Sequence, residues 1–200
     1  MTAEPVRGRP RDPRTQRAIL TAARKLLSTN GYDQISIESI AREADVSRPT
    51  VYRRWPSKAH VVFDAVFGWA DNADVLEGSG DFDTDLRRFV HGVCEFWREP
   101  IVASATMGIL ADRHSDPALF IRTQKLLDEQ TQHKFAELVG AGIEQGTVRP
   151  DVDIKMLYDL LIGTSFYTMQ VQHCDDVDDV VERLCALVMQ GAEMRGEESP

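Results

Sequence analysis

Long apolar runs, paired cysteines and strand-like alternation are all scarce in this chain of 200 residues. The longest apolar stretch, residues 101–111, falls short of the ~18 residues that a membrane-spanning helix requires. The first residues lack the apolar segment of a signal peptide. The three cysteines have no paired spacing, which argues against a disulfide framework. We therefore expect a cytoplasmic chain with reduced thiols and no membrane partner.

The charge is unevenly distributed along the chain. The 32 acidic and 23 basic side chains give a net charge of −9, which argues against a coat-like nucleic-acid binder. Residues 1–60, however, contain 12 basic and 6 acidic side chains, a balance of +6. Residues 61–200 contain the other 11 basic and 26 acidic ones, a balance of −15. This asymmetry indicates that the basic end meets a polyanion while the acidic remainder faces away from it.

Apolar residues recur at spacings of three and four along most of the chain, which predicts an all-α fold of about nine helices and no sheet. Glycines, prolines and capping residues mark the ends of these helices. The stretch from Ile101 is nearly all apolar, so we expect that helix to be buried. The expected helices span about residues 14–30, 37–41, 48–55, 58–72, 86–97, 101–112, 117–145, 153–172 and 175–191.

The second and third of these helices are separated only by Ala44, Asp45 and Val46, a spacing typical of a helix-turn-helix. A helix that enters the major groove of DNA must be free of acidic side chains. The third helix meets this demand, because residues 47–57 contain no Asp or Glu. A solvated basic helix in an ordinary bundle fits this pattern about equally well.

The ordered combination of residues 17–23, 31–32, 36–41 and 46–58 is more specific, and it resembles the DNA-binding domain of the TetR family of bacterial transcriptional regulators. The resemblance covers roughly residues 14–65. It implies a three-helix DNA-binding domain followed by a larger helical domain that binds an effector and dimerises. We expect a flexible basic arm over residues 1–13, the DNA-binding domain over 14–60, and the effector-binding and dimerisation domain over 61–200.

The resemblance also implies roles for individual residues of the first domain. Arg48, Pro49 and Arg53 occupy positions that face base edges, and an arginine can pair bidentately with guanine. Phosphate-contacting positions are filled by Thr50, Tyr52 and Lys58. Ser36 is expected to cap the second helix near a phosphate, and Ser47 to cap the third. The family's usual turn glycine is replaced by Asp45, and its usual Phe or Tyr by Trp55, which we expect to pack inside.

The N-terminal arm contains Arg7, Arg9 and Arg11 around Gly8 and Pro10. This pattern resembles an AT-hook, whose arginines lie in a narrow A·T minor groove. A basic tail that attracts DNA without specificity accounts for the same residues. Both interpretations stay open.

The apolar residues of the second domain are candidates for two sites. A bundle of this size can enclose an apolar pocket, and the resemblance implies one between the middle helices, with candidate residues Phe67, Phe89, Val93, Phe96, Trp97, Met107, Phe120, Phe166 and Met169. The last two helices carry more apolar side chains than a monomer would cover. The family dimerises through these helices, which gives the interface candidates Leu157, Leu161, Gly163, Thr164, Val181, Leu184 and Val188.

Residues that could carry other chemistry are few. His91 and Cys94 lie three residues apart on one helix but have no evident third metal ligand. His173 and Cys174 precede a run of aspartates that suits a helix N-terminus. We expect no metal, no cofactor and no enzymatic activity. The predicted function is a homodimeric repressor that a small, largely apolar effector releases from a near-palindromic duplex DNA operator. Its alternatives are a constitutive DNA-binding regulator without an effector, and an enzyme that uses the helical pocket.

Overall fold

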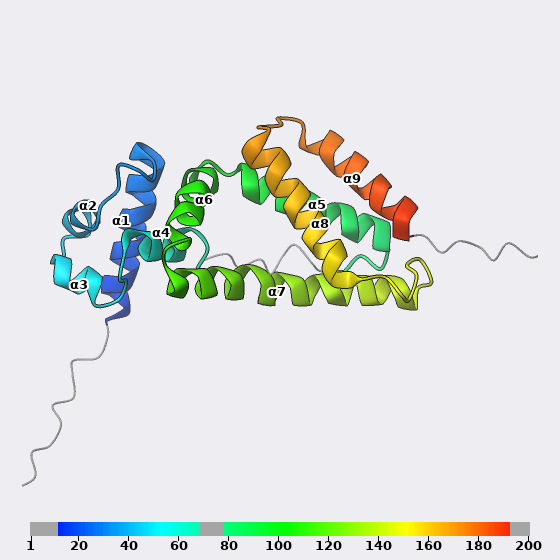
Figure 1. The fold of residues 1–200 in the computed structure, drawn as a ribbon, viewed down its shortest axis with the longest axis horizontal. Helices are drawn as coiled ribbons and strands as arrows, with labels where there is room; N and C mark the ends of the chain where they lie inside the picture. The colour runs from blue at the N-terminus through cyan, green and yellow to red at the C-terminus, as the bar shows by residue number, and fades with distance from the viewer. Residues whose placement is uncertain (1–11, 69–77, 193–200) are drawn as a thin grey trace, which may run out of the picture.

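The computed structural model describes residues 12–68 and 78–192 (Figure 1). These residues form nine α-helices and one π-helical turn, with no β-strand, which confirms the predicted all-α fold. None of the described helices is both long and apolar enough to cross a bilayer. The elements are α1 (Pro13–Asn30), α2 (Ile37–Glu43), α3 (Arg48–Tyr52), α4 (Lys58–Val66), α5 (Phe82–Arg98), α6 (Pro100–Arg113), α7 (Pro117–Glu144), α8 (Ile154–Phe166), η2 (Tyr167–Val171) and α9 (Val177–Ala192).

Helices α1, α2 and α3 form a small unit, here called the head, at one end of the molecule (Figure 1). The side chain of Asp12 caps α1 by accepting from the Arg14 amide at 2.9 Å. Gly31 ends the helix with a φ of 74°, a conformation that glycine adopts without strain. The apolar stripe of α1 faces inward, and Ile19 and Ala23 are fully buried. The predicted stripe therefore supplies the core of the head.

Helix α4 joins the head to the rest of the molecule and is buried on most of its surface. It packs against α1 on one side and against α6 on the other. The Arg24 guanidinium of α1 donates to the Ala65 carbonyl at 2.6 Å, close to the end of α4. The predicted extension of this helix to residue 72 lies partly in residues 69–77, outside the described part of the chain.

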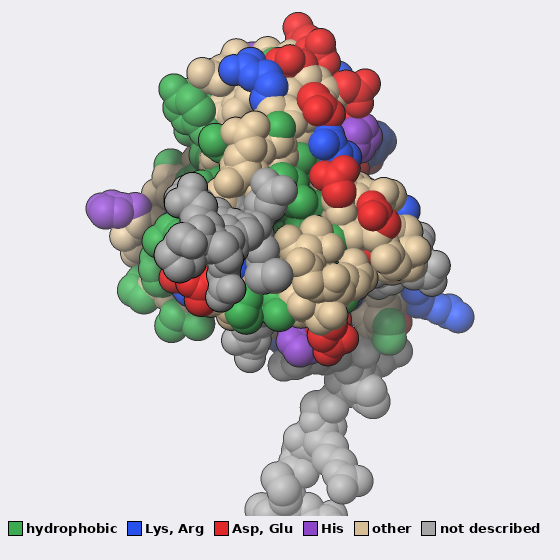
Figure 2. All heavy atoms as spheres, turned by 90° about the vertical axis from the view of Figure 1, so that its right-hand side faces the viewer, with side chains coloured by type: hydrophobic (Ala, Val, Ile, Leu, Met, Phe, Trp, Pro, Cys, Tyr) green, Lys and Arg blue, Asp and Glu red, His purple; other side chains and the backbone are tan. Residues whose placement is uncertain are grey.

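Helices α5 to α9 form the larger body (Figure 1). Helix α7 runs along its length, while α5 packs against α8 and α9. Figure 2 views the end of the body opposite the head, where acidic side chains outnumber basic ones. The charge asymmetry of the sequence thus corresponds to a spatial one, with the basic head at the other end.

Three sequence-based expectations differ from the observed helices. The third helix ends at Tyr52 and does not continue to Trp55. The helix from residue 153 changes after Phe166 into the π-helical turn η2. Helix α6 is not buried all round, because Met107 is 55% exposed and Leu110 is 37% exposed. Its composition shows no polar face, so periodicity could not distinguish its inner side from its outer side.

Candidate nucleic-acid interface

Helices α2 and α3 form the predicted helix-turn-helix. Ser36 caps α2 as expected: its Oγ accepts from the Ser39 amide at 3.1 Å, and the Ser39 hydroxyl lies 2.9 Å from the Ser36 amide that donates to it. In the turn, Asp45 adopts a φ of 52°, the left-handed conformation that the family's usual glycine adopts freely. Ile40 and Val51 are fully buried between the two helices and hold α3 against α2.

The outer surface of α3 is open to solvent. Arg48, Pro49 and Arg53 are exposed, and Tyr52 is 49% exposed. Ser47 occupies the predicted N-cap position of α3, but the expected capping hydrogen bond from its side chain is not formed. Its hydroxyl lies instead 2.8 Å from the Thr50 hydroxyl. Four of the predicted contact residues of α3 are therefore exposed, whereas Thr50 is half-buried.

Arg48 has a partner that the sequence did not suggest. Its guanidinium forms an ion pair with the carboxylate of Glu38 on α2, and the two side chains are 57% and 48% exposed. This carboxylate occupies part of the guanidinium that would pair with a guanine. Glu38 therefore competes with any anionic or base partner of Arg48.

Two predicted residues beyond α3 lie at the junction with the body. Trp55 is 2% exposed and its indole Nε1 donates to Asp64 at 2.7 Å, so the expected packing role is confirmed. Lys58 is half-buried and donates to the Tyr32 carbonyl at 3.1 Å. Its contact with a phosphate stays a prediction, and in the free protein this ammonium already has an internal partner.

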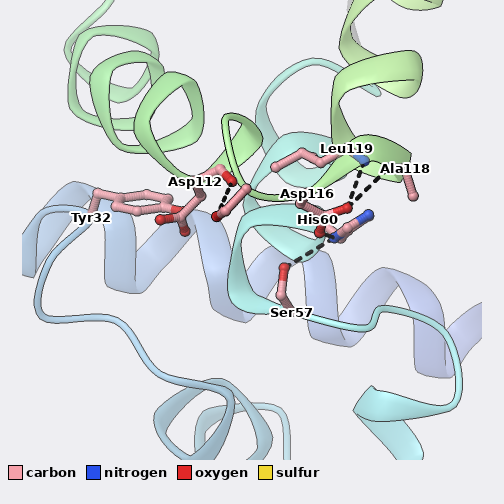
Figure 3. A network of polar contacts seen from close by, with 8 residues as sticks. Tyr32, Ser57, His60, Asp112, Asp116, Ala118 and Leu119 are labelled. Carbon is pink, nitrogen blue, oxygen red and sulfur yellow. Dashed lines mark hydrogen bonds and ion pairs between the residues drawn. The ribbon is translucent and has the colours of Figure 1, made fainter.

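A polar network joins the start of α4 to the body (Figure 3). His60 is 3% exposed, and its Nδ1 lies 3.0 Å from the Ser57 hydroxyl and 3.6 Å from the Asp116 carboxylate. The same carboxylate caps α7 by accepting from the Ala118 and Leu119 amides. Burial lowers the pKa of His60 below its ordinary value, although the Asp116 charge opposes this shift. Burial of His60 thus favours its neutral form.

The arm arginines Arg7, Arg9 and Arg11 lie outside the described residues. The described chain begins at Asp12, whose carbonyl accepts from the Arg54 guanidinium at 3.1 Å. This bond places the start of α1 beside the end of the helix-turn-helix.

Most of the predicted pocket residues lie in the body's core. Phe67, Phe96, Trp97 and Phe166 form a continuous row of rings, with successive centroids 5.9, 5.1 and 5.2 Å apart. Phe89 and Met169 are also buried, and Val93 is partly buried. Two predicted pocket residues lie elsewhere: Met107 is 55% exposed and Phe120 is 42% exposed, so neither is inside the aromatic core.

The interface candidates differ in their burial. Leu161, Val181, Leu184 and Val188 are at most 7% exposed and pack mainly in the chain's own core. Leu157 is partly buried, whereas Gly163 and Thr164 are exposed. The exposed apolar side chains of this region are instead Met156, Leu160, Tyr167, Val171 and Leu187.

The groups considered for other chemistry are not assembled into a site. His91 is half-exposed and lies 3.8 Å from Asp178. Burial raises the pKa of the Cys94 thiol, which disfavours the reactive thiolate. Within residues 12–68 and 78–192, no three His, Cys, Asp or Glu side chains are grouped closely enough to hold a metal ion.

Both the head and the body of the chain match families of known proteins. Residues 19–65 match the family described as "Bacterial regulatory proteins, tetR family", and residues 76–197 match "Tetracyclin repressor-like, C-terminal domain". The chain is 32% identical to the uncharacterized HTH-type transcriptional regulator YdeS of Bacillus subtilis, over 86% of each chain. It is 25% identical to the DNA-binding transcriptional repressor TetR of Mycobacteroides abscessus, over 72% of this chain and 75% of that one.

The fold matches that of solved regulators. The structure of the TetR family transcription regulator SCO0332 superimposes with a TM-score of 0.72 at 25% identity, covering 89% of this chain and 98% of that one. The transcriptional regulator FadR from Bacillus subtilis, solved in complex with stearoyl-CoA, gives a TM-score of 0.69 at 18% identity, covering 88% of this chain and 99% of that one. With its helix-turn-helix and its helical C-terminal body, the chain belongs to the TetR family of helix-turn-helix transcriptional regulators.

Proposed function

We propose that the protein is a homodimeric repressor that binds a near-palindromic operator through α3 and is released by a small, largely apolar effector. The exposed basic surface of α3 carries this proposal: Arg48, Pro49, Tyr52 and Arg53 project from a head whose apolar residues are buried. The acidic composition of residues 61–200 supports an orientation in which only the head approaches DNA. In this proposal residues 14–60 are the DNA-binding unit, and residues 61–200 are the effector-binding and dimerisation unit.

Selection from randomised duplex DNA tests the first part of this proposal. The purified protein is expected to enrich a two-fold symmetric sequence whose half-sites lie about one helical turn or a multiple of it apart. Arg48→Ala is expected to relax the preference at one position of each half-site, at a cost of about 1–3 kcal/mol per half-site. Enrichment of no sequence, or of one that Arg48→Ala recognises equally well, would contradict the proposal.

The exposed apolar side chains of α8, η2 and α9 support a two-fold interface on this face. Met156, Leu160 and Tyr167 recur at helical spacing, and Leu187 of α9 is 63% exposed. Introducing Glu at both Leu160 and Leu187 is expected to give monomers by light scattering, because the carboxylates would be buried without partners. Ile121→Glu on α7 is the matched control, since Ile121 is 65% exposed but lies on another face.

The effector proposal is supported by the aromatic row and by one buried polar atom within it. Trp97 is 6% exposed, and its indole N–H has no hydrogen-bond partner among the described residues. An unpaired buried donor costs free energy that a ligand acceptor would recover. This favours an effector with an apolar body and a hydrogen-bond acceptor. The stearoyl-CoA complex of the Bacillus subtilis regulator shows that a protein of this fold can accommodate an acyl thioester.

A thermal-shift screen of lipophilic compounds tests the effector proposal. A compound that binds the folded state is expected to raise the melting temperature and, by reciprocal coupling, to weaken operator binding. Trp97→Phe should reduce the shift for compounds with an acceptor more than for hydrocarbons. Stabilising compounds that leave operator affinity unchanged would contradict release by these ligands, and a screen without any binder would favour the constitutive alternative.

A further inference from the structure

Tyr32 belongs to the head but lies on α6 of the body (Figure 3). It follows α1 in the sequence and is 6% exposed. Its ring packs so closely on Gly108 that a Cβ at that position would lie 2.1 Å from the ring's Cδ1 atom. Only glycine leaves room for the ring there, because any other residue would overlap it. The close approach of head and body thus depends on a specific pair of residues.

The hydroxyl of Tyr32 makes a second contact with the same helix. It donates to Oδ2 of Asp112 at 2.5 Å, across 80 residues of sequence. Gly108 and Asp112 are four residues apart and so share one face of α6. The ring and the hydroxyl are therefore held by one helical turn. Burial, and secondarily the bond to Asp112, raise the pKa of Tyr32, so the hydroxyl keeps its proton and remains a donor.

Lys58 holds Tyr32 from the side of α4. Its ammonium donates to the Tyr32 carbonyl at 3.1 Å and lies 4.4 Å from the centre of the ring. Tyr32, Lys58, Gly108 and Asp112, here called the Tyr32 clip, thus join the turn after α1, the start of α4 and the middle of α6. Tyr32, Gly108 and Asp112 have no predicted contact with DNA, whereas Lys58 makes these contacts in addition to its predicted role at a phosphate.

We infer that the Tyr32 clip fixes the angle of the head on α6 and thereby sets the separation of the two recognition helices in a dimer. Tyr32 and Asp112 are positioning residues in this account, since they lie away from the exposed surface of α3. The separation of the recognition helices on an operator rests on the proposed function, whereas the angle of the head does not. Helix α6 also buries Val102, Ala105 and Ile109 in the body's core. A displacement of this helix therefore reaches the head directly through Tyr32, and not only through α4.

A DNA-independent measurement tests the clip first. Spin labels at Arg42→Cys on α2 and Glu144→Cys on α7 report the angle between head and body, because both side chains are exposed. Cys174→Ser removes the more accessible native thiol, while Cys94 and Cys185 are buried. Diluting the labelled protein with unlabelled protein isolates the distance within one chain.

The parent protein is expected to give one narrow distance distribution. Tyr32→Phe keeps the ring on Gly108 but removes the hydroxyl, and it should broaden the distribution while circular dichroism remains unchanged. Asp112→Asn, which replaces the charged acceptor by an amide, should have a smaller effect in the same direction. Arg87→Gln is the matched control, because it breaks the α5–α9 link to Glu182 inside the body, and it should leave the distribution narrow.

Operators of altered spacing provide the second readout. The parent protein should discriminate against sites with one base pair added to or removed from the centre. The ratio of the affinity for the normal spacing to that for an altered spacing should fall by about tenfold in Tyr32→Phe. This is the lower end of what one hydrogen bond to a charged group contributes. A variant that is merely less stable would lose affinity for all spacings equally and leave the ratio unchanged.

The outcomes separate the clip from the proposed function. An unchanged distance distribution in both Tyr32→Phe and Asp112→Asn overturns the inference, whatever the DNA results. If Tyr32→Phe does not fold, Asp112→Asn and Gly108→Ala decide, and the latter must displace the ring and broaden the distribution. If the parent protein selects no DNA, the proposed function fails, but the spin-label result still decides whether the clip fixes the head.

Discussion

Replacing Glu38 by glutamine isolates the competition for Arg48 at the candidate DNA surface. The substitution keeps the size of the side chain and removes the charge that pairs with the guanidinium. Both side chains are about half exposed, and exposed ion pairs are worth ~0.2–1 kcal/mol. A dimer contains two such pairs, so removing them should favour binding by ~0.4–2 kcal/mol, or roughly two- to thirtyfold in operator affinity.

The assay is a fluorescence anisotropy titration of the selected operator at one fixed salt concentration. Four proteins complete a double-mutant cycle: the parent, Glu38→Gln, Arg48→Ala and the double variant. Arg48→Ala alone should weaken binding, and Glu38→Gln should strengthen it only while Arg48 is present. Glu43→Gln is the matched control, because Glu43 also lies on α2 and pairs with Lys25 at 2.5 Å rather than with α3.

Two results would refute this reasoning. If Glu38→Gln strengthens binding equally in the Arg48→Ala background, the gain comes from reduced repulsion of DNA and not from release of Arg48. If Glu43→Gln gives the same gain as Glu38→Gln, the effect belongs to the net charge of the head. In either case Arg48 would lose its assignment as the residue that Glu38 restrains.

Three further predictions concern the turn, the junction and the body. Asp45→Asn keeps a residue that tolerates positive φ, so the melting temperature should not change. Because the substitution removes a negative charge near the DNA surface, operator affinity should rise more at low salt than at high salt. A gain in affinity that does not depend on salt would contradict a charge effect. Burial lowers the pKa of His60 in the folded protein. The contribution of His60 to the free energy of unfolding should therefore be complete above about pH 6.5 and decrease as the pH falls, because the unfolded chain takes up the proton first. Denaturant titrations should show this fall flattened in His60→Gln, and an unchanged slope would exclude His60 as its source. Gly142→Ala would place a Cβ 2.6 Å from the Phe82 ring and should lower the free energy of unfolding by about 1–3 kcal/mol. Gly140→Ala is the control, because Gly140 has open space around it and the substitution should not destabilise the protein. Equal effects of the two variants on thermal unfolding would contradict the packing argument.

Local signals in the sequence predicted the head well. The stripe of α1, its glycine stop, the Ser36 cap and the turn at Asp45 all depend on residues within a few positions of each other. Such signals act on the backbone directly and are little changed by tertiary packing. The predicted third helix extends to Trp55, whereas α3 ends at Tyr52. Nothing in the local composition separates Trp55 from the helix, but its side chain bonds to Asp64 of α4.

Contacts between distant helices could not be predicted in the same way. The pairs Glu38–Arg48 and Tyr32–Asp112 join residues on separate elements, and no spacing rule relates them. On α8 and α9, apolar residues occupy both the inner and the outer faces, so periodicity alone did not show that Leu161 and Leu184 point inward. The glycine at position 108 is informative only once the Tyr32 ring lies against it.

Methylation interference on the selected operator tests the central claim, that α3 enters the major groove, most directly. Guanine N7 lies in that groove, where Arg48 is expected to meet it. The account predicts that methylation of one guanine in each half-site blocks the parent protein, and that Arg48→Ala removes this interference while still protecting the same sequence. Interference that persists in Arg48→Ala, or that is absent from both half-sites of the parent complex, would contradict the account.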